Sequence, residues 1–152
     1  MNTQTNPIID TQRSLDALNA LLRGERSAVE TYQQAIAKFG SDAPTELNEC
    51  MRSHHHRVEQ LIVRIYDLGG HPDDGSGPWG AFAMLFEGGA AVFGRASAIA
   101  ALEQGEDHGL ALYHERIKDL DAESLNLVQA ELFQEQQATH AAMRALKHAA
   151  HE

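Results

Sequence analysis

The sequence predicts an all-α protein, a four-helix bundle with one long crossover between its second and third helices. Apolar residues recur at the three- and four-residue spacing of amphipathic helices through four long segments. The period-two alternation that strands require is absent from the sequence. A stretch rich in Gly and Pro separates the second segment from the third, which favours an up-down bundle with one extended connection.

Residues that start or stop helices bound each long segment. Ser14 or Asp16 is expected to cap the first helix, Gly40 to end it, and Pro44 to start the second. Residues 1–13 are polar and are expected to form a flexible arm. The four helices are therefore expected at Leu15–Phe39, Pro44–Leu68, Ala96–Leu120 and from Ala122 to the end.

The crossover combines a loop with an aromatic segment. His71–Pro78 contains turn-forming residues throughout, and Trp79–Gly94 is rich in aromatic and small residues. We expect the second stretch to form one or two short helices that pack across the bundle. A membrane-surface helix is the alternative, but the segment lacks flanking lysines and carries Glu87 in its middle.

Composition limits the classes of function. A chain of 152 residues with 43% hydrophobic content is expected to form one domain, 1–152. The formal charge is -10, and no basic stripe is present, so neither nucleic acid nor an anionic membrane is an expected partner. The sequence shows no secretory signal and no spanning segment, which predicts a cytoplasmic protein. Cys50 is the single cysteine and is expected to be a reduced, buried thiol.

A repeat relates the first helix to the third. The stretch GERSAVETY, from Gly24 to Tyr32, returns as GEDHGLALY, from Gly105 to Tyr113. Chance similarity between two amphipathic helices would reproduce the apolar period, but not the Gly-Glu pair, the small residue three positions later and the tyrosine seven later. We therefore expect the two helices to be symmetry mates.

The repeated glutamates, Glu25 and Glu106, occupy positions where the apolar stripe requires a hydrophobic residue. Burying a carboxylate is costly unless it is paired, hydrogen-bonded, metal-bound or protonated. No lysine or arginine lies on the inferred core stripes, so internal ion pairs are not expected. Other groups must therefore compensate the two inward carboxylates.

Histidines on the second and fourth helices are the candidate partners. His54 and His55 border the apolar stripe of the second helix, whereas His56 points outward, and His140 can turn inward from the fourth helix. Laying the second helix on the fourth places His55 on His140 and favours His55 over His54. Carboxylate and imidazole groups in one layer suit iron, manganese or zinc. The predicted transition-metal ligands are Glu25, His54, His55, Glu106 and His140.

At these residues the sequence resembles the ferritin-like superfamily. The Glu-x-x-small-x-x-x-Tyr frame looks like the first and third helices of that superfamily. The stretches LGGHP, GPWGAFAMLFEG and ALEQGEDHGLALY look most like a bacterial four-helix-bundle family catalogued as a domain of unknown function. The resemblance extends from about Leu15 to Leu146.

The resemblance implies a ligand pattern that this chain meets only in part. In di-iron members, the second and fourth helices each supply a Glu-x-x-His pair. Here no glutamate stands three residues before any of the candidate histidines; the residues there are Met51, Arg52, Ser53 and Gln137. The resemblance therefore implies Glu25 and Glu106 as terminal carboxylate ligands, with a second-helix histidine and His140 as imidazole ligands, and it implies no complete di-iron centre.

Two functions from different classes follow from the sequence. The first is a transition-metal-binding bundle with a redox or oxygen-handling role. The second is a metal-free structural or protein-interaction bundle, whose inward carboxylates are held by Tyr32, Tyr113 and the histidines. No nucleophile motif or cofactor fingerprint is present, so enzymatic activity is not expected unless it is that of a metal-dependent oxidoreductase. The sequence leaves open whether the chain forms a homodimer.

Overall fold

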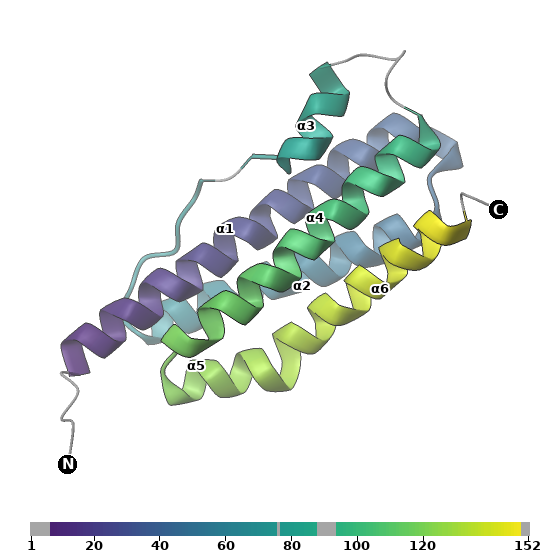
Figure 1. Ribbon diagram of the computed structural model, residues 1–152. Helices are drawn as coiled ribbons and strands as arrows, with labels where there is room; N and C mark the ends of the chain where they lie inside the picture. Colours follow the sequence, from purple (N-terminus) through teal and green to yellow (C-terminus); the bar gives the residue numbers. More distant parts are fainter. Residues whose placement is uncertain (1–6, 76, 88–93, 150–152) are drawn as a thin grey trace.

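The structure is a computed structural model that describes residues 7–75, 77–87 and 94–149 (Figure 1). The described residues form helices and connecting loops without a strand, and four long helical segments form a bundle, so the predicted all-α fold class is confirmed. Short 3-10 turns follow α1 and α4 at Gly40–Asp42 and Ile117–Asp119. The elements are α1 (Pro7–Phe39), α2 (Thr45–Asp67), α3 (Gly80–Glu87), α4 (Arg95–Arg116), α5 (Ala122–Leu127), a π-helical turn (Val128–Leu132) and α6 (Phe133–Ala149).

The first helix begins at Pro7, earlier than the predicted Leu15. The expectation of an arm is therefore wrong for residues 7–13, and residues 1–6 lie outside the described part of the chain. Proline is favoured in the first helical turn because its missing N–H would have no partner there. Ser14 does not cap the helix either. It lies inside α1, fully buried, and donates its hydroxyl to Asp121 Oδ1 at 2.5 Å.

The crossover lies along α1 before it reaches α3. Asn19 accepts a hydrogen bond from the Asp73 N–H at 2.8 Å, and Arg26 donates to the Asp73 carbonyl at 2.9 Å. The Trp79 N–H donates to the Thr31 hydroxyl at 2.8 Å, which fixes the start of α3. Figure 1 shows α3 outside the four-helix bundle, and Phe82 anchors it in the core. The predicted short helix is thus confirmed for Gly80–Glu87, while residues 88–93 lie outside the described part.

Gly105 on α4 gives the Trp79 ring the space it occupies. A Cβ at Gly105 would lie 2.0 Å from Trp79 Cε3, far inside van der Waals contact. We expect Gly105→Ala to lower the free energy of unfolding by about 1–3 kcal/mol, measured by urea denaturation. Gly24→Ala is the matched control, because its Cβ would meet only the flexible Leu112 Cδ2 at 3.1 Å. Equal effects of the two substitutions would contradict this account.

The apolar core consists of two clusters with polar residues between them. One cluster includes Leu22 and Leu61, and the other includes Tyr32 and Leu102. Along the long helices, the buried residues Glu25, His54, Arg57, Glu106, Gln136 and Thr139 fall between members of the two clusters. Cys50 lies in the second cluster, where burial raises the pKa of its thiol to about 12, as expected for an unreactive core cysteine. None of the described helices is long and apolar enough to span a membrane.

The last helix changes direction between α5 and α6 (Figure 1). The π-helical turn Val128–Leu132 lies at this point, and π-helical insertions are a common cause of helix bends. Asp121 caps the N-terminus of α5 by accepting from the Ser124 N–H at 3.3 Å. Arg64 of α2 also contacts the Asp121 carboxylate, at 3.0 Å from Nη2 to Oδ2.

Asp121 makes the stability of the fold depend on pH. Burial alone would raise its pKa, but hydrogen bonds from Ser124 and Ser14, with the charge of Arg64, hold the pKa below its ordinary value of 3.8. Its contribution to stability is therefore present above about pH 4 and is lost as the pH falls through the folded-state pKa. We expect Asp121→Asn to be less stable than the parent at pH 7, and the difference to shrink towards pH 3 in urea denaturation. A constant difference would contradict the linkage.

Candidate functional site

The two repeated glutamates face each other inside the bundle. Glu25 is 3% exposed and Glu106 is fully buried. Tyr113 donates its hydroxyl to Glu25 Oε1 at 2.9 Å, and Tyr32 donates to Glu106 Oε1 at 3.0 Å. Each tyrosine thus reaches the glutamate of the other helix, which is the reciprocal contact that a two-fold repeat requires. The inward placement of both carboxylates is confirmed.

His54 of α2 lies between the two glutamates. Its Nδ1 is 2.5 Å from Glu25 Oε2, and its Nε2 is 2.5 Å from Glu106 Oε1. A ring whose two nitrogens both face carboxylate oxygens is best matched by the imidazolium form, in which both nitrogens donate. Burial lowers the pKa of His54, but the charges of Glu106 and Glu25 outweigh burial and raise the pKa above its ordinary value. The Tyr32 ring stacks on the imidazole with centroids 5.4 Å apart.

Arg57 is a functional residue that sequence reasoning missed. Its side chain is fully buried, and its Nη1 lies 3.2 Å from Glu25 Oε1. The expectation that no cation enters the core is therefore wrong. A usable signal existed, because Arg57 follows His54 by three positions and precedes Leu61 by four, which is the spacing of one helix face. The burial of Glu25 and of Arg57 is explained by their mutual contact.

Gln136 and Thr139 of α6 complete the layer around Glu106. Gln136 donates Nε2 to Glu106 Oε2 at 3.0 Å and to the Glu106 carbonyl at 2.9 Å, and Thr139 donates to Glu106 Oε2 at 2.9 Å. Both residues also accept from Arg57, Thr139 at 3.1 Å from Nη2. A Cβ at Gly109 would lie 2.8 Å from Gln136 Nε2, so the glycine leaves room for the Gln136 amide beside the carboxylate.

The charges of this buried layer cancel. Two carboxylates face one imidazolium and one guanidinium. Burial would raise the pKa of Glu25, but Arg57 and His54 lower it below its ordinary value. Burial and the neighbouring carboxylates raise the pKa values of Tyr32 and Tyr113 well above 10.0, so both hydroxyls remain donors. We call these residues the central polar layer: Glu25, Tyr32, His54, Arg57, Glu106, Tyr113, Gln136 and Thr139.

The other two predicted ligands lie outside the central polar layer. The His55 side chain is 59% exposed and lies 3.6 Å from Glu59, and His140 pairs with Asp107 at the bundle surface. The preference for His55 over His54 is wrong, and so is the inward placement of His140. The apolar stripes allow α2 to be aligned with α6 in more than one way, and these alignments differ by about one helical turn. His54 and Gln136 both contact Glu106, so the structure supports the alignment that lays His54 on Gln136.

The central polar layer does not fit a dinuclear metal centre. It offers two carboxylates and one imidazole, and both imidazole nitrogens already lie at hydrogen-bond distance from the carboxylates. The guanidinium of Arg57, which has no lone pair to give to a metal, contacts Glu25 and donates to Thr139 in the same layer. The structure therefore places a cation of the chain itself where a metal ligand would be needed.

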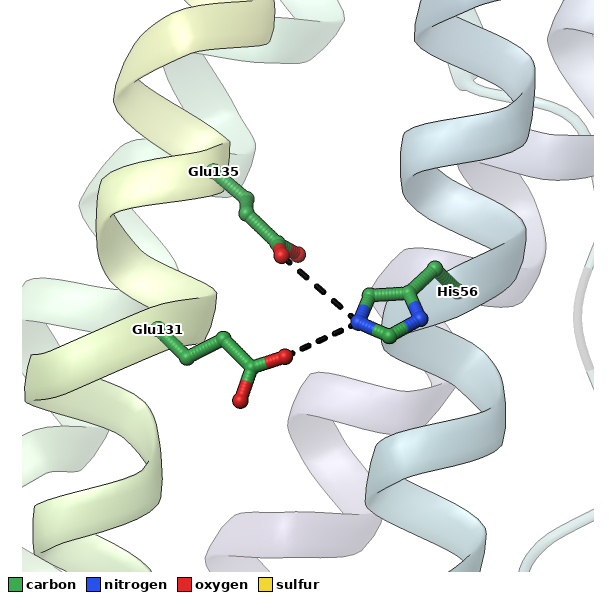
Figure 2. A group of neighbouring side chains, drawn as sticks. All are labelled: His56, Glu131 and Glu135. Carbon is green, nitrogen blue, oxygen red and sulfur yellow. Dashed lines mark hydrogen bonds and ion pairs between the residues drawn. The ribbon is translucent and has the colours of Figure 1, made fainter.

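A second group of ligand-type side chains lies at the surface between α2 and the last helix. His56 Nε2 is 2.9 Å from Glu131 Oε1 and 3.6 Å from Glu135 Oε1, and the three ligand atoms lie within 4.8 Å of one another. Figure 2 shows both carboxylates directed at the His56 ring. Oε2 of Glu135 is buried without a hydrogen-bond partner, one of two such side-chain atoms in the described residues. We call His56, Glu131 and Glu135 the surface triad.

One further group among the described residues also brings three ligand atoms within 4.8 Å of one another, and it contains His140. Glu103, Asp107 and His140 lie between α4 and α6. Asp107 is 55% exposed and already contacts His140, while Lys147 Nζ lies 3.5 Å from Glu103. Because a lysine already supplies positive charge to this group, the surface triad is the better candidate for a metal ion.

Comparison with known proteins identifies a family for this chain and a solved structure with a similar fold. The chain belongs to the family described as Domain of unknown function (DUF2383), which it matches over residues 13–119. A crystal structure of ferritin-like, diiron-carboxylate proteins from Bacillus anthracis str. Ames is similar, with a TM-score of 0.60, 18% identity, and coverage of 92% of this chain and 94% of the other. The fold is thus ferritin-like. No curated protein matches the sequence.

Proposed function

We propose that the protein binds one divalent transition-metal ion at the surface triad His56, Glu131 and Glu135. The observation that carries this proposal is the convergence of one imidazole and two carboxylates on a single point, with one carboxylate oxygen left unpartnered. Mixed nitrogen and oxygen donors suit iron, manganese or zinc. The proposal keeps the class of function that the sequence predicts and moves the site from the core to the surface.

Local helix geometry supports the triad. Glu131 lies in the π-helical turn and Glu135 one turn later, so both carboxylates project from the same side of the last helix (Figure 2). π-Helical turns inside α-helices occur frequently at functional sites. Burial raises the pKa of Glu135, so its carboxylate would gain from a nearby cation. A bound ion would also satisfy Oε2 of Glu135.

The triad leaves coordination positions open to solvent. The side chains of His56 and Glu131 are 43% and 41% exposed, so water or a small ligand can reach an ion held there. An open site on iron or manganese would be compatible with a redox or oxygen-handling role. The similar solved protein is named as diiron-carboxylate, which supports metal chemistry on this fold without locating it in this chain.

Calorimetric titration of chelator-treated, tag-free protein with Mn²⁺, Zn²⁺ and, without oxygen, Fe²⁺ tests the proposal. We expect binding of about one equivalent of at least one of these ions, because the triad is a single mixed-donor site. Loading to a hundredfold above Kd should raise the stability by about 2.7 kcal/mol. For a domain of this size the melting temperature should then rise by roughly 5–10 °C.

Variants of the triad locate the ion. His56→Ala and Glu131→Gln should each weaken binding by at least about tenfold, because even outer-shell partners contribute that much. His55→Ala is the matched control, since His55 is exposed on the same helix and lies 3.6 Å from Glu59. Binding that survives both triad substitutions, or that is lost equally in the control, would overturn the proposal.

A metal-free structural or interaction bundle is the second candidate function. The central polar layer favours it, because its ionised groups are compensated without a metal. Under this alternative, no ion binds above the level of the His56→Ala variant, and the melting temperatures with chelator and with each ion coincide.

A further inference from the structure

We infer that the central polar layer is a metal-free counterpart of a dinuclear carboxylate centre, in which Arg57 and His54 supply the positive charge that two metal ions supply elsewhere. This inference concerns the core alone and goes beyond the surface ion proposed above. It follows from the positions of the buried residues, their charges and their hydrogen bonds.

The positions follow the dinuclear pattern on all four helices. That pattern takes one glutamate from each of two helices and an i, i+3 pair, Glu-x-x-His, from each of the other two, all directed inward. Glu25 and Glu106 are the single glutamates here. The buried i, i+3 pair of α2 is His54 with Arg57, and that of α6 is Gln136 with Thr139. All six side chains belong to one connected set of contacts: Glu25, His54, Arg57, Glu106, Gln136 and Thr139.

The replacements change which group carries the positive charge, and the total stays at zero. In the dinuclear pattern four carboxylates face two divalent ions, so four negative charges meet four positive ones. Here histidine and glutamine stand at the two glutamate positions of the pairs, which leaves two carboxylates. The guanidinium of Arg57 and the imidazolium of His54 balance them. A buried layer with unbalanced charge would be strongly destabilising, so the four replacements are consistent only as a set.

Hydrogen bonds occupy every carboxylate oxygen in the layer. Glu25 Oε1 contacts Tyr113 and Arg57, and its Oε2 contacts His54. The Glu106 carboxylate has four partners: Tyr32 and His54 contact Oε1, and Gln136 and Thr139 contact Oε2. An ion could enter only by displacing Arg57, which would leave a buried guanidinium without its carboxylate. The core of this bundle therefore folds without metal.

The experiment uses the full chain with His56→Ala and His140→Ala, so that neither surface group contributes, and Co²⁺ as the probe because its visible absorption reports coordination. We expect this background to show no tight Co²⁺ binding and the same melting temperature with Co²⁺ as with chelator. Four further substitutions restore the dinuclear pattern: His54→Glu, Arg57→His, Gln136→Glu and Thr139→His. The resulting chain should bind about two equivalents of Co²⁺ and melt at a higher temperature when loaded.

Two results would overturn the inference. One is Co²⁺ binding by the background protein that disappears in Glu106→Gln, because the existing layer would then hold a metal. The other is a restored chain that folds, as judged by circular dichroism, yet binds no Co²⁺. If the restored chain fails to fold, the Co²⁺ titration of the background protein alone tests the inference. Because the background lacks His56 and His140, the surface groups do not contribute to that titration.

Discussion

Replacing Arg57 with methionine is expected to lower the free energy of unfolding by about 3–5 kcal/mol, because removal of one partner of a buried ion pair leaves the other charge uncompensated. Glu25 would lose the Nη1 contact at 3.2 Å, and Thr139 the donor at 3.1 Å. The melting temperature should fall by roughly 6–20 °C for a domain of this size.

Two further substitutions test whether the loss of stability in Arg57→Met comes from the positive charge and from its buried position. Arg57→Lys keeps a positive charge near Glu25 and should lose less stability than Arg57→Met, although lysine cannot reproduce the guanidinium fork. Arg52→Met, at an exposed position of the same helix, should stay within about 0.5 kcal/mol of the parent. If Arg57→Met melts like Arg52→Met, Arg57 does not compensate the buried carboxylates.

The double substitution Glu25→Leu with Glu106→Leu is expected to be more destabilising still. Leucine would continue the apolar stripe on both helices, and without a buried cation the change would be close to neutral. Arg57 and His54 would instead lose both carboxylates, and arginine cannot neutralise itself by releasing a proton. We expect a loss above about 5 kcal/mol, comparable with the whole stability of many domains. Circular dichroism at 25 °C should show a largely unfolded chain.

Adding Arg57→Met to this double variant should recover part of the stability, because the buried unpaired guanidinium is then removed. Glu30→Leu with Glu115→Leu, on α1 and α4 but outside the central polar layer, should remain folded. A triple variant no more stable than the double one would show that the two leucines act by steric misfit and not through charge.

Much of the fold could be predicted from the sequence because its determinants are local. Gly40 and Gly69 end helices at φ 63° and 80°, a conformation that glycine adopts without strain. The repeat that relates Glu25 to Glu106 can be read directly from the residue identities. Tyr32 and Tyr113 occupy equivalent positions in that repeat, and each contacts the glutamate of the other helix. The start of α1 at Pro7 escaped prediction because no apolar period marks the first two turns.

The apolar period alone does not identify the partners of the glutamates, because they depend on how helices are rotated against one another. His54, His55 and His56 are consecutive, and a small rotation of α2 decides which one is buried. The same rotation places Arg57 inside, against the general rule that arginine stays at the surface. Glu131 lies in the π-helical turn, an irregularity that the apolar period does not reveal, so the approach of Glu131 and Glu135 to His56 was not predicted.

The sequence by itself determined an all-α bundle, an internal repeat and two inward carboxylates, because helix periodicity and residue identity act within single elements. Only the tertiary structure decided which groups compensate the charge of those carboxylates. The free energy of a buried charge depends on atoms from other helices a few ångströms away, and here those atoms belong to Arg57, His54, Gln136 and Thr139.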